Sequence, residues 1–279
     1  MPIYCRTRVE EDSGKHTVTG WATDISAGPE DEADQTLNFI VTTDNDSLFA
    51  VKPAIDATTG TLTYTLADNA FGKATVTVKL QDNGGTENGG KDTFVQTFTI
   101  TVTNVNDEPV ITSNGGGDEA SVKVKENTTA VTTVTAEDVD EGTTLVFSIA
   151  GGDDAALFAI NPATGVLTFK TAPNYEEPSD KNGDGDYEVI VQVSDGELTD
   201  SQKITVTVTD VNDAPVITSN GGEETAIVEV EENTTAVTTV TATDEDGDAL
   251  TYAITGGADA DLFSIDPVTG ELAFITAPD

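Results

Sequence analysis

Cysteine, histidine and tryptophan are almost absent from this 279-residue chain, which has one of each. A disulfide within the chain is therefore excluded, and zinc, which prefers His and Cys ligands, has little to bind. An extracellular domain with a full hydrophobic core can be stable without disulfides, so the cysteine count does not settle the compartment.

Basic residues are also scarce, because 12 Lys and Arg face 51 Asp and Glu and give a formal net charge of −39. This charge repels nucleic acid and anionic lipid, and it attracts multivalent cations. Scattered carboxylates can serve solubility alone, so only clustered ones indicate a cation site.

Long apolar runs and catalytic constellations are missing as well. The start MPIYCRTRVEED lacks the apolar stretch of a signal peptide, and no run of 18 apolar residues occurs, so we expect no transmembrane segment in this chain. His16 has no evident catalytic partner, and so many acids make carboxylate pairs unavoidable. We predict that the chain is not an enzyme.

The same unit occurs nearly three times. The sequence PVITSNGG at Pro109–Gly116 recurs unchanged at Pro215–Gly222, 106 residues later, and a fixed period of this kind marks a repeat protein. We predict three domains: residues 1–107, a diverged first copy; residues 108–213, a second copy; and residues 214–279, a truncated third copy. Residues 175–213 have no counterpart in the third copy.

Short β-branched segments with period-two alternation fill each copy. A shared segment starts with Leu-Phe, passes through a turn that ends in Thr-Gly at Gly60, Gly165 and Gly270, and continues as an alternating strand. The pattern predicts an all-β fold of tandem β-sandwiches with Greek-key connections. It also places the recurring aromatic residues and Trp21 in the cores.

Acidic residues recur at the junctions of the copies. The linkers Asn104–Pro109 and Asp210–Pro215 end the two complete copies, and an acidic pair follows each linker. Residues two apart point the same way in extended chain, so each pair offers two oxygen ligands on one side. Calcium takes six to eight oxygens of this kind. The other interpretation is that these acids form turns and cap strands.

These motifs resemble those of cadherin repeats in their bacterial form, over essentially the whole chain. The family's acidic linker is matched by Asp210, Asn212, Asp213 and Pro215, whereas the first linker has Asn104 at the leading aspartate. The resemblance implies Ig/cadherin-like sandwiches that bind calcium at their junctions. The second junction would use Glu126, Glu176, Asp210, Asn212, Asp213, Asp244 and Asp246. The first would use Glu11, Asn106, Asp107, Asp138, Asp140 and Asp195.

The two junctions differ, because the first copy reads LADNAFG where Glu176 would have its counterpart. We therefore expect fewer ions or weaker binding at the first junction. A separate segment, Asp180–Gly185, begins like a calcium loop, but Val191 stands where that loop has its closing Glu. This favours a solvated hairpin loop over a metal site.

The resemblance implies a calcium-stiffened segment of a bacterial cell-surface or secreted adhesin, with adhesive or spacer function. The expected partners are calcium and either like repeats on neighbouring chains or a surface polysaccharide; nucleic acid is excluded by charge. The alternative is an extracellular polysaccharide-binding module, which would present exposed aromatic faces.

Overall fold

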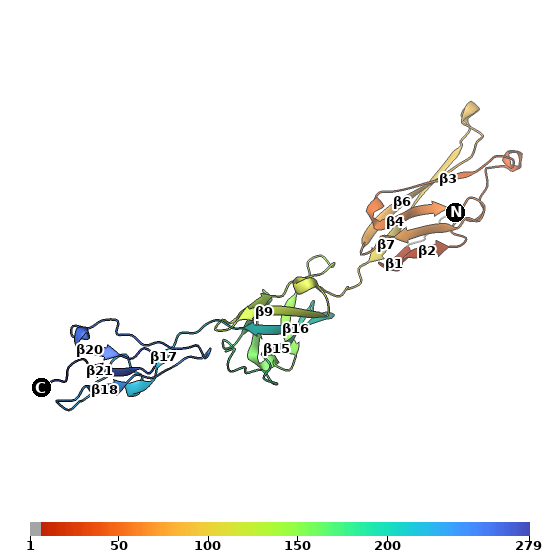
Figure 1. The fold of residues 1–279 in the computed structure, drawn as a ribbon. Helices are drawn as coiled ribbons and strands as arrows, with labels where there is room; N and C mark the ends of the chain where they lie inside the picture. The colour runs from red at the N-terminus through yellow and green to blue at the C-terminus, as the bar shows by residue number, and fades with distance from the viewer. Residues whose placement is uncertain (1–6) are drawn as a thin grey trace. The chain divides into compact units, whose positions relative to one another are not determined.

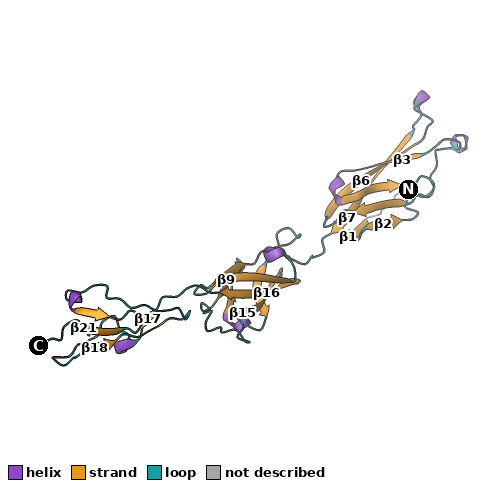
Figure 2. Cartoon of the chain, viewed as in Figure 1, coloured by secondary structure: helices purple, strands orange, loops and turns teal. Residues whose placement is uncertain are grey.

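A computed structural model describes residues 7–279, apart from the side chain of Asn88. Cys5 lies outside these residues. The described chain is all-β, as predicted, and contains no α-helix (Figure 2). Short 3-10 turns join some strands: η1 (Glu30–Glu32), η2 (Asp46–Leu48), η3 (Glu87–Gly89), η4 (Ser113–Gly115), η5 (Ala155–Leu157), η6 (Ser219–Gly221) and η7 (Ala260–Leu262). None of the described helices could cross a membrane.

The first copy is a sandwich of two sheets (Figure 1). One sheet has the spatial order β1 (Thr7–Glu10), β7 (Thr93–Thr103), β6 (Gly72–Gln81), β3 (Asn38–Thr43), and the other β2 (Lys15–Val18), β5 (Leu62–Leu66), β4 (Phe49–Ile55). β1 runs parallel to β7, and the other pairs are antiparallel.

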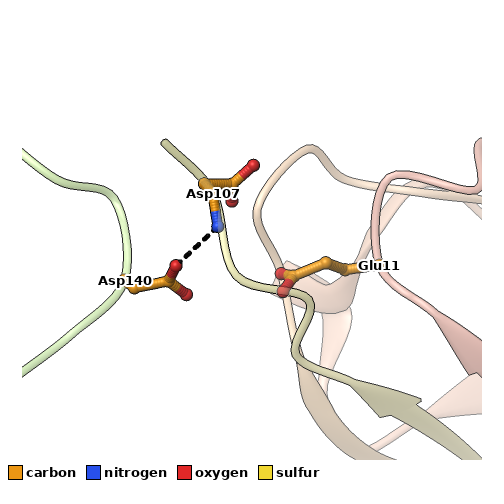
Figure 3. A group of neighbouring side chains, drawn as sticks. All are labelled: Glu11, Asp107 and Asp140. Atoms are coloured by element: carbon orange, nitrogen blue, oxygen red, sulfur yellow. Dashed lines mark hydrogen bonds between the residues drawn. The ribbon is translucent and has the colours of Figure 1, made fainter. Parts of the chain in front are cut away.

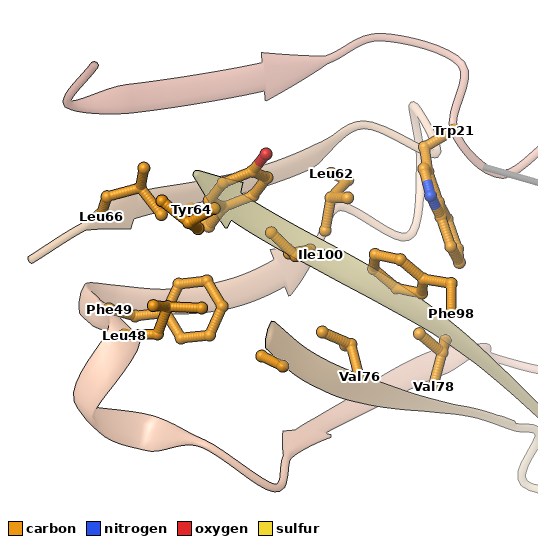
Figure 4. Close-up of a cluster of buried hydrophobic side chains, with 12 residues drawn as sticks. Trp21, Leu48, Phe49, Leu62, Tyr64, Leu66, Val76, Val78, Phe98 and Ile100 are labelled. Carbon is orange, nitrogen blue, oxygen red and sulfur yellow. The ribbon is translucent and has the colours of Figure 1, made fainter. Parts of the chain in front are cut away.

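The core of this sandwich lies between the two sheets, where alternate side chains of β5, β6 and β7 are buried (Figure 4). Leu62, Val76 and Ile100 are completely buried at its centre. Trp21 is 6% exposed, so its predicted core position is confirmed. Burial of this kind stabilises a domain by about 25 cal/mol per Å² of apolar surface.

The second copy repeats the arrangement. Its larger sheet has the order β12 (Val146–Gly151), β15 (Asp186–Ser194), β16 (Thr199–Thr209), β9 (Glu119–Lys125); the smaller has β10 (Ala130–Thr133), β14 (Val166–Phe169), β13 (Phe158–Ile160). A two-stranded sheet joins β8 (Val110–Ile111) to β11 (Ala136–Glu137). The predicted aromatic core is confirmed here, because Phe158 and Phe169 are buried with their rings 4.5 Å apart.

The third copy keeps only part of this framework. Its strands are β17 (Val216–Ile217) with β19 (Ala242–Thr243), and β18 (Ala236–Thr239) with β21 (Glu271–Phe274) and β20 (Phe263–Ile265). Residues 225–231, which correspond to β9, form no strand. Val230 is 37% exposed, whereas its counterpart Val124 is 8% exposed. The parallel partner of β9 is β16, and this chain contains no counterpart of β16 for the third copy.

The chain divides into two compact units. The first runs to Val110 and also takes in Glu137–Leu145 and Ser194–Asp200; the second contains Ile111–Ala136, Val146–Val193 and Ser201–Asp279. The two loops that join the first unit carry Asp138, Asp140 and Asp195, three of the predicted calcium ligands. Each of the two acidic sites described below therefore lies within one unit.

Candidate metal centres

Carboxylate groups gather at two places in the described chain. In the first acidic cluster, Glu11, Asp107 and Asp140 place oxygens within 4.8 Å of one another. The second acidic cluster contains two such groups: Glu126, Glu176 and Asp210, and Glu176, Asp213 and Glu245. Hard oxygen ligands grouped at this spacing suit calcium better than zinc.

Glu11 anchors the first acidic cluster directly after β1. Its side chain is 4% exposed, and its Oε1 accepts a 2.7 Å hydrogen bond from the backbone N–H of Val105. Figure 3 shows Asp107 and Asp140 beside it, with the Asp107 N–H donating to Asp140 Oδ2 at 2.8 Å. The linker backbone thus fixes carboxylates from three separate segments.

Two amide side chains complete the first acidic cluster. Asn104 donates from Nδ2 to Asp140 Oδ1 at 2.7 Å, and Asn106 donates from Nδ2 to Asp195 Oδ2 at 2.6 Å. Asp138 accepts the backbone N–H of Asp140 at 2.8 Å. The structure therefore brings the six predicted residues of this junction into one network, in which part of the negative charge already has amide partners.

Glu126 has the same position in the second acidic cluster, after β9. It is 1% exposed, and its two oxygens accept the backbone N–H groups of Val211 at 2.7 Å and Tyr175 at 2.8 Å. The Tyr175 contact places the next residue, Glu176, in reach of Glu126 and Asp210. The first copy has no carboxylate at the position that corresponds to Glu176. Its Leu66–Gly72 loop is held by a different contact, in which the Asn69 N–H donates to Asp12 Oδ1 at 2.8 Å.

The remaining predicted residues of the second junction have different positions. Asp213 belongs to the cluster, and its N–H donates to Asp246 Oδ2 at 2.6 Å. Asn212 donates to the Asp213 carbonyl at 2.8 Å. Asp244 accepts the Asp248 N–H at 3.1 Å, which is a turn contact.

Glu245 was not predicted as a ligand, because strict alternation points it away from Asp244 and Asp246. Residues 245–246 form a bend rather than a strand, so the alternation rule does not apply there.

Mutual repulsion and burial destabilise the ionised form of several of these carboxylates and so raise their pKa values. Burial first, and then the charges of Glu126, Asp246 and Asp210, raise the pKa of Glu176 above its ordinary value. Burial likewise raises the pKa of Asp210, Glu11 and Asp107. The ion pairs of the described residues are Lys52–Asp46, Lys181–Asp153 and Lys203–Glu188, so none of them neutralises a cluster carboxylate.

The Asp180 loop is built differently. The Asp180 carboxylate is 7% exposed and accepts the backbone N–H groups of Gly183, Asp184 and Gly185 at 2.6 to 3.1 Å. Its oxygens therefore serve the loop's own backbone, as in an Asx turn. The loop is not the solvated hairpin that the sequence favoured, because it lies between β14 and β15, which belong to different sheets, and because Asp180 is buried.

Comparison with protein families matches residues 120–209 to the cadherin domain. The matched region contains Glu126, Asp138, Asp140, Glu176 and Asp195. The region that matches the cadherin domain thus supplies residues to both acidic clusters.

Relatives of known sequence extend this likeness beyond the matched domain. Mouse Cadherin-23 is 33% identical over 243 residues, which are 80% of this chain and 7% of that protein. Human Protocadherin Fat 4 is 34% identical over 148 residues, 50% of this chain and 3% of that protein. The chain therefore spans only a small part of these relatives, which are mammalian and do not support a bacterial origin.

A solved structure supports the fold. The crystal structure of human CDH23 EC21-23 has a TM-score of 0.52 and 18% identity, and the match covers 87% of this chain and 80% of that chain. The predicted tandem β-sandwich architecture is confirmed by this likeness together with the sheets described above.

Proposed function

We propose that the chain is a calcium-stiffened, non-catalytic segment of an extracellular adhesion protein, in which the cadherin repeats act as a stalk or adhesive array. The observation that carries this proposal is the gathering of carboxylates within 4.8 Å at both linkers, with no cationic side chain paired to them in the described chain. The proposal includes the bacterial cell-surface origin that the sequence predicts, which the mammalian relatives do not support.

The proposed action of calcium follows from charge repulsion. Two carboxylates about 4 Å apart repel by roughly 1 to 4 kcal/mol at surface-like dielectric. A cation bound between Glu11, Asp107 and Asp140 would remove this repulsion and hold the loop Glu137–Leu145 against the linker. Because the cation binds the assembled cluster better than the separated ligands, it stabilises that arrangement by mass action.

The predicted ligand set divides between the clusters. The first acidic cluster would use Glu11, Asn106, Asp107, Asp138, Asp140 and Asp195. The second would use Glu126, Glu176, Asp210, Asn212, Asp213, Asp244 and Asp246, to which the geometry adds Glu245. With more carboxylates and no paired amide on Asp210, the second acidic cluster is the stronger site.

The domain ranges 1–107, 108–213 and 214–279 form part of the same proposal, since each linker ends one copy and begins the next. A spacer role is favoured over specific recognition, because near-identical copies suit a function that depends on length and stiffness. Polysaccharide binding has less support, because Trp21 and the recurring aromatic residues of the first two copies are buried; Phe71, Phe94 and Tyr175 are exposed but do not recur between the copies.

Terbium luminescence tests the second acidic cluster directly. Tyr175 contacts Glu126 through its backbone and precedes Glu176, so energy transfer from its ring to a bound terbium ion reports occupancy of this site. We expect a saturable signal that calcium displaces and that Tyr175→Phe strongly reduces without changing calcium affinity. Absence of luminescence and of heat on calcium titration at millimolar concentration would contradict the proposal.

A further inference from the structure

The outer face of the larger sheet in the first copy differs in charge from the rest of the chain. Alternate side chains of β1, β7, β6 and β3 point away from the core, as their burial patterns show, and together they form what we call the threonine face. Threonine is the commonest residue there, and the charged residues are Arg8, Glu10, Lys73 and Lys79. In a chain of net charge −39, this face is therefore positively charged.

The three cations lie at the two ends of the threonine face. Arg8 and Lys73 are the neighbours of Thr101 on its two sides. Lys79 lies further along β6, roughly 20 Å from Lys73 by the rise of an extended chain. The outward positions between these two lysines, such as Thr77, hold threonine. The longer cationic side chains thus border a floor of short hydroxyl side chains.

None of these cations is neutralised within the described part of the chain. The ion pairs found among residues 7–279 do not include Arg8, Lys73 or Lys79, whereas Lys52 of the same copy is paired with Asp46. At physiological ionic strength the Debye length is about 8 Å, so acids elsewhere on the domain do not cancel the local positive charge. The threonine face is therefore able to bind an external anion.

The second copy does not share this charge. When β6 and β15 are aligned on the aspartate that follows each strand, Asp186 stands at the position of Lys73 and Glu188 at that of Thr75. Glu188 also pairs with Lys203 at 2.7 Å. The positive face is thus specific to the diverged first copy. Near-identical repeats suit a spacer, but a feature confined to one copy suits recognition.

The first copy also carries an acidic segment of complementary charge, residues 29–34 with the sequence PEDEAD. It contains η1, and Glu30, Asp31 and Asp34 are exposed. The ion pairs of the described residues include none of these acids. The segment is fixed to the β6–β7 loop, because the Thr36 N–H donates to Asn83 Oδ1 at 2.9 Å.

We propose that the threonine face binds segment 29–34 of a second copy of this chain. Carboxylates of the segment pair with Arg8, Lys73 and Lys79, and threonine hydroxyls donate to the remaining carboxylate oxygens. Charge complementarity selects a second copy, since one chain presents both surfaces. The contact joins two different surfaces, so it is heterologous and can continue from chain to chain. This inference rests on the adhesive part of the proposed function and names its partner, but it does not require calcium.

The size of the face sets the strength of this contact. Four strands about 4.8 Å apart and roughly 20 Å long offer on the order of 400 Å², half of the roughly 800 Å² per partner that a stable complex buries. A single pair of chains therefore associates weakly. Many chains on one surface associate more strongly through multivalency.

Aggregation of beads coated with the full chain tests the proposal under multivalent conditions. Light scattering is recorded at about 0.15 M salt, where the Debye length is about 8 Å, in calcium and separately in chelator. We expect aggregation in both, and the double variant Lys73→Glu and Lys79→Glu should reduce it at least fivefold. The matched control is Lys15→Glu with Lys91→Glu, which changes the net charge equally at exposed lysines outside the face and should reduce it less than twofold.

A charge exchange identifies the partner segment. Glu30→Lys with Asp31→Lys should also abolish aggregation, and mixing these beads with the Lys73→Glu, Lys79→Glu beads should restore it. Glu223→Lys with Glu224→Lys, an equal change at exposed acids of the third copy, should not restore it. Circular dichroism verifies that each variant is folded.

Three results would overturn the inference: no aggregation of the unmodified chain, equal loss in the face and control variants, or restoration by the third-copy variant. Aggregation only after addition of polygalacturonate would also overturn it, because an acidic polysaccharide would then be the ligand. Calcium titration of the same proteins separates the two proposals. Calcium binding without face-dependent aggregation contradicts this inference alone, and face-dependent aggregation without calcium binding contradicts calcium stiffening alone.

Discussion

The two acidic clusters are built on the same plan but differ at single positions. Glu11 and Glu126 each hold the following linker through a 2.7 Å hydrogen bond from a backbone N–H. The first acidic cluster has Asn104, which donates to Asp140, where the second has Asp210, whose pKa burial and the neighbouring Asp246 raise. At this position one cluster has an amide donor and the other an additional negative charge, although Asn127 and Asn174 also donate to Asp213 and Glu245 of the second cluster.

If both clusters bind calcium as proposed, this difference would let a repeat protein vary its response to calcium without changing its fold. The backbone contacts that shape the two clusters are preserved, so the number of carboxylates would set the cation affinity. Glu176 and Glu245 add two carboxylates to the second acidic cluster, and the first has neither. The following predictions alter one such position at a time.

The largest effect is expected from Glu126→Gln. The amide cannot accept from both Val211 and Tyr175, so one buried donor loses its partner at a cost of about 1 to 3 kcal/mol. Calcium affinity of the second acidic cluster should fall about a hundredfold or more. The matched control is Glu232→Gln, the same motif in the third copy, where the side chain is exposed. An equal loss in both variants would refute the assigned role of Glu126.

A reciprocal exchange at this position of the two linkers should make the calcium affinities of the two clusters more alike. Asp210→Asn should lower calcium affinity at the second acidic cluster about tenfold, and Asn104→Asp should raise it at the first by a similar factor, since each changes one charge within a few Å of the cation. Calorimetric titration in a Glu126→Gln background isolates the first cluster. If Asn104→Asp weakened binding, the comparison drawn above would be wrong.

Acidification should weaken the second acidic cluster by a smaller factor. The pKa values of Glu176 and Asp210 lie above their ordinary values of 4.5 and 3.8, so these groups take up protons before free carboxylates do as the pH falls from neutral. Protons then compete with calcium. Without calcium, the pH dependence of stability has the opposite sign. The folded state binds these protons more tightly than the unfolded state, so the free energy of unfolding falls as the pH rises through the raised pKa values. Unfolding between pH 4 and 7, in chelator and in calcium, should show opposite slopes from these groups.

The smallest effect is expected from Glu245→Val, which copies Val139 of the first junction. Glu245 lies at the edge of the cluster and is exposed, so affinity should fall only about two- to threefold. Asp248→Asn serves as the control, because it removes a charge that is near in sequence but does not belong to the cluster. A larger loss for Asp248→Asn would place the cation nearer the Asp244 turn.

The sequence predicted the framework well where local chemistry decides the outcome. Gly60, Gly165 and Gly270 all adopt φ of 67 to 70°, and a Cβ on Gly165 would lie 2.0 Å from the Val134 carbonyl oxygen. Glycine is therefore required at the end of this turn, both because φ is positive and because a side chain would collide with a neighbouring carbonyl group.

Long-range pairing and irregular turns were less predictable. Residues 225–231 carry the same alternation as β9 but form no strand, because a strand also needs a partner. Glu245 was missed because its place in the cluster depends on a bend that period-two reasoning does not describe. The precise network of Asn104 and Asn106 likewise arises from contacts between segments far apart in the sequence.

Thermal unfolding in chelator and in excess calcium tests the central claim most directly. For the full chain, calcium at about a hundred times its dissociation constant should add about 2.7 kcal/mol to the stability of the structure it binds, which corresponds to a rise in midpoint of roughly 10 °C or more for a domain of this size. The double variant Glu11→Gln and Glu126→Gln should lose most of this rise. An unchanged midpoint in the full chain would contradict the claim that the acidic clusters are calcium sites.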